Sequence, residues 1–271
     1  MYLPKSLEHF LDTKQRTISY SCNSDIGLLR KTNQDNLVCN GTYRRIDSLK
    51  ERFSLIGTAP LSGFHLFGIF DGMGGEECGE IASFLAAEEA ASLAISASPE
   101  NELRDLCLRS NRKICGYAET HGIFAMGTTA AMLAFVGQKL WLCNIGDSKV
   151  LHFDHHRLKQ ISVDHLVPAP FGRKRPLSQN LGIPEEIMII EPQIAPVSYS
   201  DGDIFILCSD GLTDMVSLEE MWSVITGSGI QDLADKLTER ALRNGGKDNI
   251  TVIVIKAESE TTEFVQGESD R

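Results

Sequence analysis

Short apolar runs that end in turn residues recur along the chain and predict β-strands. Residues 64–70, FHLFGIF, end at Asp71-Gly72, and residues 203–208 end at Ser209-Asp210-Gly211, as expected for buried strands that stop in acidic turns. Two other runs flank Gly137-Gln138 and predict a hairpin. The pattern predicts strands over residues 64–70, 128–136, 139–145, 149–153, 203–208 and 250–255.

Other stretches carry apolar residues at helical spacing. Ser217, followed three residues later by Glu220, is a capping box that opens one helix, and Asn244-Gly245 ends the helix after it. Helices are predicted over residues 77–95 and 100–117, from Ser217 onward, and over residues 230–241. Because strands come in runs and helices in pairs, the fold class is α+β, with helices packed on sheet, rather than a series of βαβ crossovers.

Composition narrows the domain organisation. The chain has 271 residues, of which 42% are hydrophobic and 23% charged, and its formal net charge is −11. This is typical of a globular protein, and no linker-like stretch interrupts its middle. We therefore expect one domain over residues 17–256, a poorly ordered extension over residues 1–16 and a polar, acidic tail over residues 257–271.

The same composition excludes several classes of function. No apolar run reaches the roughly 18 residues of a membrane span, and the first residues lack the apolar stretch of a secretory signal, so we expect a cytoplasmic protein without membrane contacts. The acidic balance argues against binding of nucleic acid, which requires a positive surface. The seven cysteines include no C-x-x-C pair, which predicts reduced, mostly buried thiols rather than disulfides or a zinc site.

The candidate chemistry lies in aspartates at the ends of strands. A single Asp-Gly after a strand is usually only a turn, but four aspartates occupy such positions beside Gly or Asn, and Asp35 and Asp214 add charge to the same region. We expect these side chains to face one rim of the sheets. The four strand-end positions are Asp71, Asp147, Asp210 and Asp248.

Carboxylates crowded into a half-dry cleft require a cation, because buried ions are costly and repel one another. Oxygen ligands without His or Cys favour Mg²⁺ or Mn²⁺, and a shared carboxylate can bridge two ions about 3.5 to 4 Å apart. Such a pair suits hydrolysis of a phosphate ester. Arg30, five residues before Asp35, carries the planar guanidinium that binds phosphate, although a surface arginine paired with an acidic neighbour is the other interpretation.

Six motifs occur in order along the chain. They are Asn33-Gln34-Asp35, Phe70-Asp71-Gly72-Met73-Gly74-Gly75, Gly127-Thr128-Thr129, Asn144-Ile145-Gly146-Asp147-Ser148, Ser209-Asp210-Gly211-Leu212-Thr213-Asp214 and Asp248-Asn249-Ile250-Thr251. Each alone is weakly specific, but in this order they resemble the metal-dependent protein serine/threonine phosphatases of the PPM, or 2C, type in their compact bacterial form. The resemblance spans about residues 17 to 256.

The resemblance implies a four-layer α-β-β-α sandwich with two central antiparallel β-sheets and a metal cleft at one end. It implies an enzyme that hydrolyses phosphoserine and phosphothreonine by attack of a hydroxide bridging two divalent metals, Mn²⁺ or Mg²⁺, two per chain. Phosphorylated proteins would be its partners, together with a cognate Ser/Thr kinase. The chain would act as a monomer.

Residue roles carry over from the family to the matching positions. Asp71 would bridge the two metals, and the Gly72 carbonyl would bind one of them. Asp210 and Asp248 would complete the direct ligands, while Asp35 would reach the metals through water. Among these, the catalytic residues would be Asp35, Asp71 and Asp210.

The remaining matches concern a third ion, the phosphate and the proton. Asp147 and Asp214 would help to hold a weaker third ion, and Arg30, also catalytic, would hold the substrate phosphate. Met73 stands where many relatives outside the bacterial group carry His, the favoured acid for the leaving alkoxide, and Met cannot donate a proton. His165 is a weak substitute, since a structural His is the better interpretation.

The segment between Asp164 and Leu181 departs from the family, because it is shorter than the usual flap beside the cleft. Flaps help to select substrates, so specificity does not transfer. Arg173-Lys174-Arg175 lies in this segment and could attract phosphorylated or acidic substrates, although a solvated loop is the default.

Two other functions compete with phosphatase activity. The first is a catalytically lapsed regulator that binds phosphoproteins through Arg30 without turnover, against which the complete acidic set argues. The second is a two-metal nuclease, which the net charge of −11 disfavours.

Overall fold

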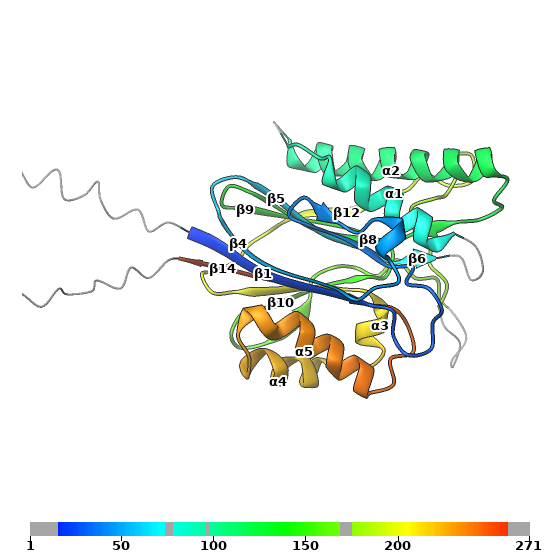
Figure 1. Ribbon diagram of the computed structural model, residues 1–271. Helices are drawn as coiled ribbons and strands as arrows, with labels where there is room; N and C mark the ends of the chain where they lie inside the picture. The colour runs from blue at the N-terminus through cyan, green and yellow to red at the C-terminus, as the bar shows by residue number, and fades with distance from the viewer. Residues whose placement is uncertain (1–15, 74–77, 96–97, 169–174, 260–271) are drawn as a thin grey trace, which may run out of the picture.

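The computed structural model describes residues 16–73, 78–95, 98–168 and 175–259. Two six-stranded sheets lie face to face between helical layers (Figure 1). Sheet I has the order β11-β10-β13-β14-β1-β4, and sheet II has the order β12-β9-β8-β5-β2-β3. All strand pairs are antiparallel. The α+β class and the four-layer sandwich are therefore confirmed.

Sheet I is built around one long pair, in which Arg16 of β1 faces Ser259 of β14 and Asp25 faces Ile250. The pair therefore runs along the length of the sandwich. Its end at Asp25 and Ile250 leads into the segments of the acidic rim. The strands of sheet I are β1 (Arg16–Asp25), β4 (Phe53–Pro60), β10 (Lys149–Phe153), β11 (Leu158–Gln160), β13 (Ile204–Cys208) and β14 (Ile250–Ser259).

Sheet II contains the predicted hairpin, whose two strands pair from Ala130–Ile145 to Val136–Lys139. A short two-stranded ladder of β6 and β7 lies beside it and links the acidic turn after β5 to the start of β8. The strands are β2 (Asn36–Cys39), β3 (Thr42–Tyr43), β5 (Phe64–Phe70), β6 (Gly72–Met73), β7 (Gly127–Thr128), β8 (Ala130–Val136), β9 (Lys139–Ile145) and β12 (Gln193–Val197).

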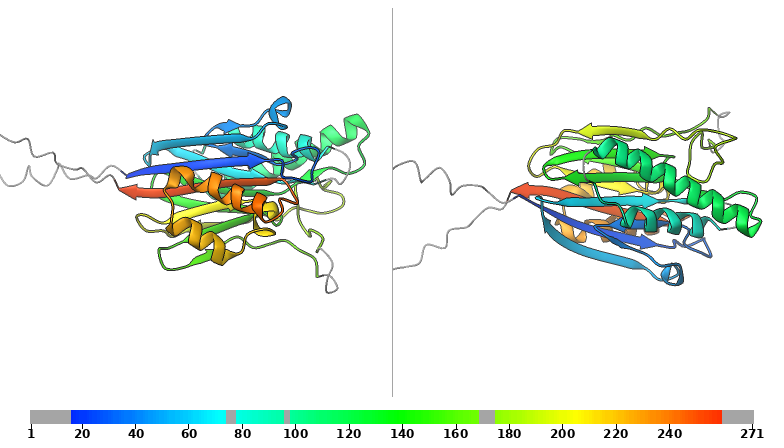
Figure 2. Two further views of the ribbon diagram at one scale, coloured as in Figure 1. Left: turned by 60° about the horizontal axis from the view of Figure 1, so that its bottom comes forward. Right: turned by 90° about the horizontal axis from the view of Figure 1, so that it is seen from above.

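Helices cover the outer face of each sheet. Figure 2 shows α2 lying obliquely across sheet II when the molecule is viewed from above, and α4 and α5 cover the opposite side. None of the helices in the described ranges is long and apolar enough to cross a membrane. The helices are α1 (Gly79–Ala91), α2 (Pro99–His121), α3 (Asp210–Thr213), α4 (Leu218–Thr226) and α5 (Ile230–Arg243), with a 3-10 turn at Ile46–Ser48.

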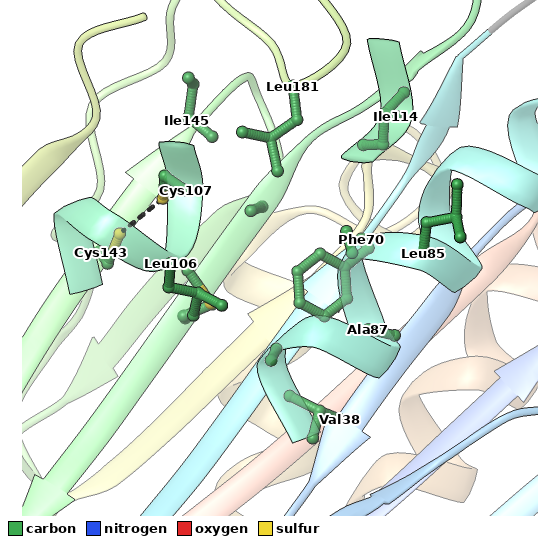
Figure 3. Close-up of a cluster of buried hydrophobic side chains, with 14 of the residues drawn as sticks. Val38, Phe70, Leu85, Ala87, Leu106, Cys107, Ile114, Cys143, Ile145 and Leu181 are labelled. Atoms are coloured by element: carbon green, nitrogen blue, oxygen red, sulfur yellow. Dashed lines mark hydrogen bonds between the residues drawn. The ribbon is translucent and has the colours of Figure 1, made fainter. Parts of the chain in front are cut away.

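Three buried apolar clusters hold the four layers together. One lies between the two sheets, where Phe67 packs edge-on to Tyr20 and Phe135. The second joins sheet II to α1 and α2 (Figure 3), and the buried face of α1 is made largely of alanine, which allows close helix-to-sheet approach. The third joins sheet I to α3, α4 and α5.

All seven cysteines are free, and five of them are buried. The Sγ atoms of Cys107 on α2 and Cys143 on β9 approach to 3.5 Å inside the second cluster (Figure 3). The prediction of mostly buried thiols is confirmed.

The predicted elements correspond to observed ones, with differences at their ends. The strands at 139–145 and 149–153 are observed with the predicted bounds, whereas the predicted strand 128–136 is divided into β7 and β8. The predicted helix 77–95 is shorter, Gly79–Ala91, and the helix expected at 100–117 extends to His121, where Gly122 in a left-handed conformation ends it. The strands that were not predicted are β1, β2, β3, β4, β6, β11 and β12.

The structure describes only part of the two terminal segments that the sequence predicts. Of the extension expected at residues 1–16, residues 1–15 lie outside the described ranges. Of the tail expected at residues 257–271, residues 260–271 lie outside them, and β14 continues through Ser259. The domain boundaries remain predictions.

The capping box at the start of α4 generates a stability prediction. Ser217 Oγ accepts a hydrogen bond from the Glu220 backbone N–H at 3.2 Å, and the Glu220 carboxylate accepts one from the Ser217 N–H at 3.1 Å. Replacing Ser217 by Ala should lower the free energy of unfolding by about 1 kcal/mol, measured by urea denaturation. Ser223→Ala, an exposed position on the same helix, is the control, and an equal effect of both substitutions would contradict the capping role.

Candidate active site

The fold brings the strand-end aspartates to one cavity of about 380 Å³. Asp71 follows β5, Asp147 lies between β9 and β10, Asp210 begins α3 after β13, and Asp248 precedes β14. Of the residues predicted for the site, those lining this cavity are Arg30, Asp71, Gly72, Asp147, Asp210 and Asp248. The expected common rim is therefore observed for these positions.

Asp35 and Asp214 lie at different depths. Asp35 is only 2% exposed and lies behind the cavity wall, where it accepts a hydrogen bond of 2.8 Å from Ser209 Oγ. Asp214 is exposed and lines a smaller adjacent cavity of about 180 Å³, together with Asp147, Asp164 and Asp210. The carboxylates thus form one continuous acidic region with a buried and an open side.

The backbone around Asp71 is held rigidly. Its N–H donates to Thr129 Oγ1 at 3.0 Å, and its carbonyl accepts from the Thr129 N–H and from Thr128 Oγ1, both at 2.9 Å. At Gly72 a Cβ atom would lie 2.3 Å from the Gly79 carbonyl oxygen, so no larger residue fits. The Gly-Thr-Thr motif therefore fixes where the Asp71 carboxylate and the Gly72 carbonyl stand.

Burial and mutual repulsion dominate the electrostatics. Burial raises the pKa of the Asp71 carboxyl well above its usual value, and the charges of Asp35 and Asp210 raise it further. Burial also raises the pKa of Asp35 to about 7, although hydrogen bonds from Thr251 and Ser209 oppose the shift. These carboxylates are destabilised as anions unless positive charge lies among them.

The donor set fits a hard divalent cation. The cavity presents carboxylate and carbonyl oxygens, and neither His nor Cys is among its described lining residues, which is the chemistry that Mg²⁺ and Mn²⁺ prefer. Across the residues that the structure describes, no three His, Cys, Asp or Glu side chains are arranged to hold an ion as they stand. Backbone carbonyl and water oxygens also bind these ions, so the carboxylates need not complete a site alone.

Arg30 faces the carboxylates from the solvent side. Its Nη2 donates to Asp248 Oδ2 at 2.5 Å, and 43% of its side chain is exposed. Burial lowers the pKa of Arg30, but the hydrogen bond and charge of Asp248 outweigh this effect and raise it overall. Arg30 therefore pairs with an acidic neighbour and lines the cavity at the same time, so both interpretations of this residue describe part of its setting.

Asn249 organises the loop that carries Arg30, a role the sequence alone did not reveal. Its side-chain oxygen accepts from the Gln34 N–H at 2.8 Å, and its amide donates to the carbonyls of Ile26 and Thr32. At Gly211 a Cβ atom would lie 1.9 Å from the Asn249 carbonyl oxygen, so α3 and the start of β14 are in direct backbone contact. The signal was its place beside Asp248 in the last motif.

The structure places the two residues considered in connection with proton donation and describes part of the flap. Met73 lines the cavity. His165 Nδ1 accepts from the Gly146 N–H at 3.1 Å, and burial lowers the pKa of its ring, which matches a structural His. Arg175 lines both cavities, whereas Arg173 and Lys174 lie outside the described residues, as do Gly74 and Gly75.

Comparison with known proteins places these features in a family. A family model described as protein phosphatase 2C matches residues 44–175. The serine/threonine protein phosphatase PstP of Mycobacterium tuberculosis is 30% identical over 253 residues, which cover 88% of this chain and 44% of that protein. The serine/threonine phosphatase stp of Listeria monocytogenes is 29% identical over 211 residues, which cover 69% of this chain and 82% of that protein.

The likeness extends to solved structures. The catalytic domain of serine/threonine protein phosphatase PstP, in complex with two manganese ions, superposes with a TM-score of 0.71 at 29% identity and covers 90% of this chain and 100% of that one. The chain spans less than half the length of the mycobacterial protein and most of the Listeria protein. Sequence, fold and ordered motifs agree, and the chain belongs to the protein phosphatase 2C family.

Proposed function

We propose that this protein hydrolyses phosphoserine and phosphothreonine in phosphorylated proteins and that the reaction depends on two Mn²⁺ or Mg²⁺ ions per chain. The observation that carries the proposal is the group of mutually repelling, half-buried carboxylates around one cavity, with a guanidinium at its rim. The manganese-bound relative and the phosphatase names of the similar proteins support it.

The predicted site residues would have distinct roles in binding the ions. Asp71, the Gly72 carbonyl, Asp210 and Asp248 would hold the two ions, and Asp35 would act on them through water. When bound, such ions activate water and neutralise charge that develops on the phosphate oxygens. Rigid support of the Asp71 backbone by Thr128 and Thr129 keeps the ligands in place.

Substrate phosphate would be bound by Arg30. Its guanidinium lies at the open side of the cavity, where exchanging Asp248 for a phosphate costs little because the pair is solvated. Arg175 lines the same cavity and would add positive charge for an acidic or phosphorylated segment. Because the side chain of Met73 cannot donate a proton, the leaving alkoxide must receive its proton elsewhere.

Several finer expectations belong to the same proposal. Asp147 and Asp214 share the smaller cavity with Asp210, which supports a weaker third ion there. A cytoplasmic location, action as a monomer and a cognate Ser/Thr kinase as a partner remain predictions.

Neutralising a central carboxylate tests the metal site. Asp71→Asn and Asp210→Asn should each reduce Mn²⁺-dependent hydrolysis of a phosphothreonine peptide more than about 100-fold, because even residues that only orient ligands are worth 10- to 100-fold. Circular dichroism should show an intact fold. Asp232→Asn, an exposed carboxylate on α5 that pairs with Lys236, is the matched control, and near-full activity of both site variants would exclude the mechanism.

Replacing Arg30 tests phosphate binding. Arg30→Lys keeps the charge but loses the planar pair of donors, so KM for the phosphopeptide should rise roughly 10-fold with a smaller change in kcat. Steady-state kinetics at saturating Mn²⁺ measure both constants. Lys31→Ala, at the neighbouring exposed position, should leave KM unchanged, and an unchanged KM in Arg30→Lys would remove Arg30 from the phosphate site.

The raised carboxyl pKa values predict an unusual dependence of stability on pH. Between an unfolded pKa near 3.9 and the folded value of about 7 for Asp35, the folded state binds more protons than the unfolded state, so stability falls as pH rises through this window. In chelator, Tm should decrease from pH 5 to pH 8, and added Mn²⁺ should restore it at pH 8. A Tm in chelator that rises over this range would refute the electrostatic account.

A further inference from the structure

Arg44 is a buried cation that no motif identified. Its side chain is 1% exposed, and its guanidinium donates to Ser24 Oγ at 2.7 Å and to the carbonyls of Ser48 at 3.0 Å and Glu51 at 2.6 Å. Within the described residues it forms no ion pair with a carboxylate, and its Nε lacks a hydrogen-bond partner. A charge buried this deeply lowers stability unless hydrogen bonds or opposite charges compensate for it.

Ser24 connects Arg44 to the acidic region. Its Oγ receives N–H donors from Arg44 Nη1 at 2.7 Å and from Asn33 Nδ2 at 3.0 Å, and it lies 2.9 Å from Thr251 Oγ1. Two incoming donors occupy both acceptor sites of a hydroxyl. The proton of Ser24 must therefore be donated to Thr251, which fixes the direction of this hydrogen bond.

Thr251 passes the same direction on to Asp35. Its hydroxyl, which accepts from Ser24, interacts with the Asp35 carboxylate, and its backbone N–H donates at 3.0 Å to Ser209 Oγ, which itself donates to Asp35 Oδ2 at 2.8 Å. The chain of donors therefore runs from Arg44 through Ser24 and Thr251 to Asp35, and each bond polarises the next. All four side chains are at most 2% exposed, so water does not interrupt the chain.

We propose that Arg44 is a positioning residue for the metal site, acting on Asp35 through the hydroxyls of Ser24 and Thr251. The inference rests on the proposed function, in which Asp35 acts on the ions through water. Arg44 supplies a fixed positive end to the chain, and Thr251 with Ser209 then holds the Asp35 carboxylate in one orientation. The same guanidinium anchors the turn at Ile46–Ser48, so a purely structural role is the competing explanation.

Mn²⁺ binding separates the two roles, measured by titration calorimetry on the full chain at pH 7.5. Ser24→Ala and Thr251→Val break the chain of hydroxyls without touching the Ser48 and Glu51 carbonyls. We expect each to weaken Mn²⁺ binding about 10-fold, the range found for residues that orient metal ligands. Arg44→Met should weaken binding to the same extent, and Arg44→Lys should recover part of the loss.

A double variant and a control sharpen the test. Because one chain carries the effect, Arg44→Met combined with Thr251→Val should lose about 10-fold in Mn²⁺ affinity, whereas independent effects would give about 100-fold. Leu103→Ala, buried on α2 in the cluster that joins sheet II to its helices, should lower Tm without changing Mn²⁺ affinity.

The outcomes distinguish this inference from the proposed function. Wild-type Mn²⁺ affinity in Ser24→Ala and Thr251→Val would overturn the positioning role, even if Arg44→Met failed to fold. A 100-fold loss in the double variant would also overturn it. If the wild-type chain itself neither binds Mn²⁺ nor hydrolyses a phosphothreonine peptide, the proposed function fails first.

Discussion

The repulsion among carboxylates around Asp71 is the constraint on which the site depends. Burial alone raises the pKa of the Asp71 carboxyl, and the nearby anions raise it further, so the native fold holds several acidic groups close together around a half-buried position. Such an arrangement persists only because the surrounding structure over-determines it. That support comes from short polar side chains and backbone groups: the Thr129 hydroxyl and N–H both bind the Asp71 backbone, and the Asn249 side chain binds the loop that carries Arg30.

The sandwich explains why these groups meet. Antiparallel strands from both sheets end at the same rim, so residues distant in sequence, such as Asp71 after β5 and Asp248 before β14, become neighbours without a dedicated loop to carry them. The close backbone approach of Gly211 to Asn249 leaves no room for a side chain between α3 and the residue before β14. The register of the two sheets therefore fixes the relative positions of the site residues.

Local chemistry determined which strands and which site residues could be predicted from the sequence. Continuous apolar runs such as β5 and β13 were recognisable as strands in the sequence, and the strand-end aspartates and their motifs identified the residues of the cavity. Strand β1 was not recognisable, because its sequence RTISYSCNSD is rich in hydroxyl side chains, contains an amide and a carboxylate, and yet is largely buried. Most of those groups are tolerated inside because they find hydrogen-bond partners across the fold, as Ser24 does with Thr251 and Ser21 with the Ile230 carbonyl. Arg44 was missed for the same reason, since a lone arginine in sequence is a surface residue by default.

The two arginines of the site illustrate why both kinds of cation are present. Arg30, with 43% of its side chain exposed, can exchange Asp248 for an incoming anion at little cost, because solvent screens either partner. Arg44 cannot move, since three protein acceptors and complete burial hold its guanidinium. A mobile charge suits a ligand that must enter and leave, and a fixed charge suits a carboxylate whose orientation must not change. In the roles proposed for them the two arginines could not be exchanged: a buried phosphate-binding arginine would be inaccessible to substrate, and a solvated arginine behind Asp35 would not hold that carboxylate in place.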